Sequence, residues 1–73
     1  MPLVHIKGLG GCLSVSQKQE LIRKVTDAIV SVEGEGLRPV TWVLFDDVAS
    51  GEGGVGGQAV TVEALREMSR QAA

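Results

Sequence analysis

The chain has very few residues that can form disulfides or aromatic contacts. Its 73 residues include one cysteine, two prolines, one tryptophan, one phenylalanine and no tyrosine. A single cysteine, Cys12, excludes an internal disulfide and favours a reducing compartment, so we expect a cytoplasmic protein. Chains of this length bury only about 60% of their unfolded surface, and oligomerisation is a usual remedy. We therefore expect one small domain, residues 1–73, that assembles with other subunits.

Long apolar runs and clustered positive charge are also missing. No stretch approaches the roughly 20 apolar residues of a membrane span, and the N-terminus lacks the basic and apolar regions of a signal peptide. The net charge is −2 and no run of Lys or Arg exists, which argues against nucleic acid and membrane partners. His5, the only histidine, cannot gather the ligands of a metal site, and we expect neither metal nor cofactor.

The residues that are present are mostly aliphatic, and their spacing predicts an α/β fold. Ser14 and Gln17 have the spacing of a capping box, and the apolar residues that follow recur at three- and four-residue steps, as in a helix. Residues 2–7 and 40–46 are rich in β-formers, and the second run is nearly continuous, as in parallel strands. The expected elements are strands 2–7 and 40–46, helix 14–33, a glycine-rich segment 51–58 and a C-terminal helix 61–71.

The strand–helix–strand order predicts a βαβ unit with a right-handed crossover. Two strands and one helix leave one sheet face wet and both sheet edges open. The apolar second strand makes that arrangement unfavourable, so association follows from the chain itself.

Three features together resemble the 4-oxalocrotonate tautomerase family, whose small βαβ subunits assemble as hexamers. They are Pro2 directly after Met1, the helical run from Ser14 to Ile29, and the segment from Gly54 to Gln58, which is similar to the family's terminal hairpin. The resemblance implies a tautomerase-like βαβ subunit with a Gly-rich hairpin over 51–58 and a short C-terminal helix. The small Pro2 favours removal of Met1, which frees a secondary amine that acts as general base and acid in such families.

The chain departs from the family at the residues that hold substrate. Leu13 and Trp42 stand where dicarboxylate-specific members have arginines, and Gly53 stands where they have an aromatic residue. Arg38 and Trp42 are the candidate substrate-binding residues: Arg38 reaches the pocket from a neighbouring subunit, and Trp42 forms its apolar wall. The competing interpretations are a solvated loop arginine and a subunit-interface anchor.

The leading hypothesis is an isomerase, a keto–enol tautomerase that uses Pro2 on an enol or 2-oxo acid. One alternative keeps the fold and changes the reaction, since residues 11–19 resemble part of one subunit of a heteromeric dehalogenase that hydrates halogenated acrylates. Another is a non-catalytic subunit of a heteromeric assembly.

Other reactive side chains favour structural interpretations. Asp46 and Asp47 are neighbours on a strand, so they point to opposite faces and cannot share a substrate. Lys7 is more consistent with a solvent-facing residue than with a neighbour of Pro2. Cys12 precedes a helix N-terminus, which favours the thiolate only if the thiol is accessible.

Overall fold

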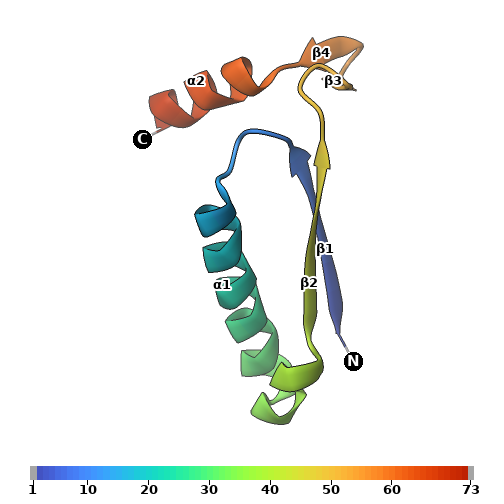
Figure 1. The fold of residues 1–73 in the computed structure, drawn as a ribbon, viewed down its shortest axis with the longest axis vertical. Helices are drawn as coiled ribbons and strands as arrows, with labels where there is room; N and C mark the ends of the chain where they lie inside the picture. The colour runs from blue at the N-terminus through green and yellow to red at the C-terminus, as the bar shows by residue number, and fades with distance from the viewer. Residues whose placement is uncertain (1, 73) are drawn as a thin grey trace.

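The computed structural model describes residues 2–72 and has the expected α/β class, with a βαβ unit followed by a hairpin and a short helix. Met1 lies outside the described residues. In chain order the elements are β1 (Leu3–Leu9), α1 (Val15–Glu33), the 3-10 helix η1 (Glu35–Val40), β2 (Trp42–Val48), β3 (Gly53–Val55), β4 (Gln58–Val60) and α2 (Val62–Ala72) (Figure 1).

The two long strands pair in parallel, from Leu3 opposite Trp42 to Leu9 opposite Val48. The predicted bounds 2–7 and 40–46 were wrong at their ends. Both strands run further because each supplies the other's ladder partners, so that even Gly8 pairs with Asp47. The second strand begins later because residues 35–40 form η1, which the sequence analysis did not predict.

Helix α1 is capped at both ends by residues that flank it in the sequence. The Ser14 side chain accepts a hydrogen bond from the backbone N–H of Gln17 (3.1 Å), and the Gln17 side chain accepts one from the N–H of Ser14 (2.9 Å). Gly34 ends the helix with a φ of 110°, a conformation that favours glycine. The predicted start at residue 14 is therefore the cap, and the helix itself begins at Val15.

The glycine-rich segment is an ordered hairpin, in which β3 and β4 are antiparallel. Gly56 and Gly57 form its two-residue turn with φ values of 59° and 82°, as tight hairpin turns require. The predicted bounds 51–58 were too short, since β4 continues to Val60. Thr61 then caps α2, its hydroxyl accepting from the N–H of Ala64 (3.2 Å).

Within residues 2–72, the sheet of β1 and β2 is covered on one face only. On the α1 side, Val4, Ile6, Val43 and Phe45 are half-buried. The opposite face, which we call the open face, carries the exposed apolar side chains Leu3 (58%), Trp42 (51%) and Leu44 (40%). The radius of gyration is 14.9 Å, compared with about 11 Å for a compact chain of this length.

Helix α2 lies across the end of the unit where β1 runs into α1 (Figure 1). Val62 is buried there, and its side chain lies beside Gly11. The backbone N–H of Val62 also donates to the Ser50 hydroxyl (3.0 Å). Within residues 2–72, no helix is both long and apolar enough to cross a membrane.

Candidate active site

Pro2 lies directly before β1 and is half-buried. Its carbonyl accepts a hydrogen bond from the backbone N–H of Trp42 (3.0 Å), which ties it to the start of β2. Because side chains alternate along a strand, the Pro2 ring shares the α1 side of the sheet with Val4 and Ile6. The candidate catalytic nitrogen is therefore at the end of the sheet where both parallel strands begin.

Trp42 lies opposite Leu3 in the ladder, and its side chain is on the open face. The Trp42 side chain and the Pro2 ring thus face opposite sides of the same sheet. Within one subunit they share only a backbone hydrogen bond. Trp42 can form an apolar wall only for a Pro2 that comes from another subunit.

Arg38, in η1, is at the same end of the sheet but is already held by two carboxylates. Its Nη1 lies 2.7 Å from Asp27 Oδ1 in α1, and its Nε and Nη2 donate to the carboxylate of Glu35. The hydrogen bonds to Glu35 and then to Asp27 raise the pKa of the Arg38 guanidinium. A substrate carboxylate would have to compete with both acids for this arginine.

The two aspartates of β2 form local pairs. Asp46 Oδ2 lies 3.7 Å from His5 Nε2 on the open face, whereas Asp47 pairs with Lys18 of α1 on the other. The two aspartates therefore face opposite ways, as predicted. Lys7 lies opposite Asp46, roughly 15 Å along β1 from Pro2. Within residues 2–72 no group of three acidic, cysteine or histidine side chains is suited to a metal ion.

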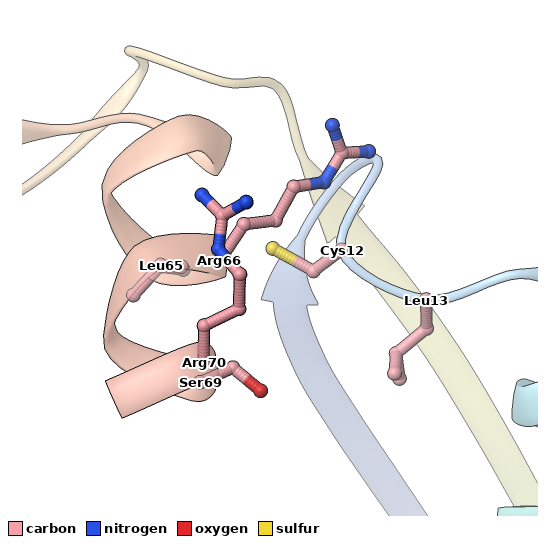
Figure 2. Close-up of a pocket in the computed structure, with 6 residues that line it drawn as sticks. All are labelled: Cys12, Leu13, Leu65, Arg66, Ser69 and Arg70. Carbon is pink, nitrogen blue, oxygen red and sulfur yellow. The ribbon is translucent and has the colours of Figure 1, made fainter. Parts of the chain in front are cut away.

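A pocket of about 470 Å³ lies at the opposite end of the unit, between α2 and the loop that joins β1 to α1. Figure 2 shows the side chains that line it: Cys12, Leu13, Leu65, Arg66, Ser69 and Arg70. Arg66 and Arg70 were not among the site residues predicted from the sequence. Their four-residue spacing, which places both on one face of a helix, was the available signal.

A second, smaller pocket of about 220 Å³ lies between the ends of β1 and β2 and the hairpin. Lys7 is its charged lining residue, and the others are glycines or aliphatic side chains. Neither pocket is lined by Pro2, Arg38 or Trp42. Neither of these two pockets therefore brings the three predicted site residues together.

Comparisons with known proteins decide the family. Residues 2–63 match the profile of the tautomerase family, described as "Tautomerase enzyme". The chain belongs to the tautomerase family. It is 34% identical over 61 residues to a protein of Dickeya dadantii (strain 3937) named "Probable tautomerase K2", a match that spans 84% of this chain and 90% of that protein.

Solved tautomerase structures have the same fold. The crystal structure of DmpI from Helicobacter pylori is 34% identical, with a TM-score of 0.69, and the match covers 81% of this chain and 95% of that one. The crystal structure of apo unFused 4-OT is 28% identical, with a TM-score of 0.72, and the match covers 88% and 98%. The resemblance drawn from Pro2, the capped helix and the glycine-rich hairpin is thereby confirmed.

The match to the tautomerase family profile includes one end of the subunit and only part of the other. The matched residues 2–63 contain Pro2, Arg38, Trp42 and the hairpin. Arg66 and Arg70 lie outside the match, in the part of α2 that follows it. Isomerase chemistry of the tautomerase type is therefore supported by the family, while the pocket beside α2 has to be interpreted from its own residues.

Proposed function

We propose that this chain is a keto–enol tautomerase whose catalytic group is the amine of Pro2 after removal of Met1. The observation that carries the proposal is the position of Pro2: it follows Met1 directly and begins the first strand of a tautomerase-family βαβ unit. The substrate is an enol or 2-oxo acid. The amine takes the proton from the enol oxygen, the electrons of the C=C double bond shift to form the C=O bond, and the resulting ammonium returns a proton to carbon.

The chemistry of a free prolyl amine supports this role. An α-amino group ordinarily has a pKa of about 7.7–8.0, close to the range in which a general base is most effective. An acylated proline nitrogen has no such basicity, so the activity requires that Met1 is absent.

The rest of the site comes from assembly in this proposal. The open face bears Leu3, Trp42 and Leu44, and a second copy would cover them. In a hexamer of identical subunits, Trp42 of a neighbour forms the apolar wall beside Pro2, and Arg38 of a neighbour binds the substrate carboxylate.

The test compares three forms of the protein, each checked by intact mass for loss of Met1. The first is the wild type, the second is Pro2→Ala, and the third has one alanine inserted between Met1 and Pro2. The inserted alanine keeps the proline ring in place but acylates its nitrogen. Ketonisation of 2-hydroxymuconate and phenylenolpyruvate should fall at least about 100-fold in both altered forms, the usual contribution of general acid–base catalysis. Equal rates in wild type and the insertion form would refute the proposal.

A non-catalytic role within a heteromeric assembly is the second candidate, and Arg38 favours it. Both carboxylates that hold Arg38 come from its own subunit, so the arginine is occupied before any substrate arrives. Purified chain alone should then be inactive on enols and on 3-haloacrylates, and gain activity only with a different tautomerase-fold subunit. Activity of the isolated chain rules this candidate out. The cytoplasm, with its reducing conditions, fits the lone Cys12 in either case.

A further inference from the structure

The pocket beside α2 has two guanidinium groups on one wall. Arg66 and Arg70 are four residues apart on α2, and Figure 2 shows both side chains extending beside the Cys12 thiol. We propose that this pocket binds a small organic carboxylate, whose charged group is held by Arg66 and Arg70 and whose apolar body lies against Leu13 and Leu65. The proposal does not depend on the role of Pro2.

The charges around the pocket favour an anion. Arg66 Nη2 donates to the backbone carbonyl of Gly11 (2.8 Å), which fixes the side chain against the loop without neutralising it. Among residues 2–72, no carboxylate pairs with Arg66, and Arg70 pairs with Glu67 of its own helix (2.7 Å). The two arginines thus have one carboxylate between them as an ion-pair partner, although the whole chain is net negative.

The shape and lining of the pocket favour a small molecule with an apolar body. A volume of about 470 Å³ is in the range of small-molecule sites, which are mostly apolar with a few placed polar groups. Leu13 and Leu65 provide apolar surface from the two sides, the first from the loop and the second from α2. A planar guanidinium binds a carboxylate through two parallel hydrogen bonds, and two such groups give the charged end a defined position.

The pocket is a place in the subunit separate from the Pro2 end. β1 has seven residues, so its two ends are roughly 20 Å apart at about 3.3 Å per residue. Pro2 precedes the first of these residues, and Cys12 follows the last. Arg66 and Arg70 also lie outside residues 2–63, which match the profile of the tautomerase family.

Cys12 offers a direct test, because it is the only cysteine and lines the pocket. Iodoacetate is a small carboxylate and iodoacetamide its neutral counterpart. Both react by the same step: the Cys12 thiolate forms an S–C bond and iodide leaves. The ionisation of the thiol therefore affects both rates equally and cancels in their ratio. The ratio measures how strongly the pocket attracts a carboxylate. Mass spectrometry of the folded protein at low salt measures both rates.

We expect the iodoacetate-to-iodoacetamide ratio to fall about three-fold for each arginine removed, in Arg66→Gln, Arg70→Gln and the double variant. This is the order of effect of a unit charge about 6 Å away in a water-like dielectric. Arg23→Gln, which removes an exposed arginine of α1 outside the pocket, is the matched control and should leave the ratio unchanged. Raising the salt concentration should lower the wild-type ratio towards that of the double variant.

Benzoate provides a second measurement that does not need a reactive thiol. Titrated benzoate should shift the backbone NMR signals of Cys12 and Leu65 in the wild type, more strongly than neutral benzamide does. Those shifts should be lost in the double variant and kept in Arg23→Gln. A rate ratio unaffected by both substitutions, or benzoate shifts equal in wild type and double variant, would overturn the proposal.

Discussion

At the end of the sheet where β1 and β2 begin, Arg38 forms ion pairs with two carboxylates. At the opposite end, in the part of the chain that the structure describes, Arg66 and Arg70 have one carboxylate as an ion-pair partner. Arg38 is enclosed by Asp27 and Glu35, whereas Arg66 has a backbone carbonyl and Arg70 has Glu67 as partner. A ligand anion at the first end has to displace protein carboxylates. At the second end it adds to the positive charge of Arg66, with which no carboxylate among residues 2–72 forms an ion pair.

This difference shows that residue type alone does not identify a binding arginine. Arg38 was the arginine selected from the sequence, as a residue that reaches the pocket of a neighbouring subunit. Whether Arg38 is free to bind a ligand depends on how many acidic side chains lie close to it. Those acids come from α1 and η1, which lie together only in the folded chain. Arg66 and Arg70 were unremarkable in the sequence because the loop that completes their pocket is more than 50 residues away in the chain.

The two ends also differ in what completes them. Trp42 is on the open face and reaches a Pro2 only through another subunit, whereas the pocket beside α2 is formed within one subunit. Leu44→Glu should prevent the proposed assembly, because it places a charge in the middle of the open face, where Leu44 is 40% exposed. We expect the variant to sediment as a monomer and to lose tautomerase activity, while Cys12 keeps its preference for iodoacetate.

Val32→Glu is the control for that experiment, since Val32 is 86% exposed on α1 and lies outside the open face. It should assemble as the wild type does. An intact assembly in Leu44→Glu, or loss of both functions together, would show that the two ends are not separable.

Much of the fold follows from rules that act over a few residues. The capping box at Ser14, the end of α1 at Gly34 and the apolar stripe between them are local, and all were predicted. The strand ends were missed because a ladder depends on the partner strand: Gly8 is a poor strand residue that pairs with Asp47 all the same. The site was predicted least well. Pro2 could be selected from its place after Met1, but the side of the sheet on which Trp42 lies depends on tertiary pairing.

Substituting one buried valine in α1 and one in α2 measures how much each helix contributes to stability. Val30 in α1 is 5% exposed, and Val30→Ala should lower the free energy of unfolding by about 2 kcal/mol, from lost transfer energy and a cavity. Val62→Ala at the base of α2 should change global unfolding much less, because α2 is attached mainly through Val62 and its neighbours. It should nevertheless reduce the iodoacetate preference of Cys12.

Urea unfolding and the Cys12 rate ratio, measured on both variants, check this pair of expectations. The opposite pattern, with Val62→Ala the more damaging to global stability, would mean that α2 is an integral part of the fold. Met68→Ala serves as the control on α2, since Met68 is 63% exposed and should affect neither measurement.

Ser14 tests whether the loop that carries Cys12 and Leu13 is held from the α1 side as well. Ser14→Ala removes the acceptor for the N–H of Gln17, and such cap losses cost about 1 kcal/mol. We expect that decrease in the urea unfolding free energy, with fraying confined to the first turn in hydrogen exchange. Ser16→Ala, two residues later inside the helix, has no cap to lose and should be within about 0.5 kcal/mol of wild type.

The smallest expected effect concerns the pair that occupies Arg38. The hydrogen bond from Arg38 lowers the pKa of the Glu35 carboxyl below its ordinary value of 4.5. Because the folded state then binds protons less readily than the unfolded state, the pair stabilises the protein fully above about pH 4.5. That contribution is lost as the pH falls through the lowered pKa. Urea midpoints measured from neutral to acidic pH should therefore show a shallower acid decline in Glu35→Gln than in wild type. In an Arg38→Gln background the same substitution should leave the acid decline unchanged. An equal change in both backgrounds would mean that Arg38 does not lower the pKa of Glu35.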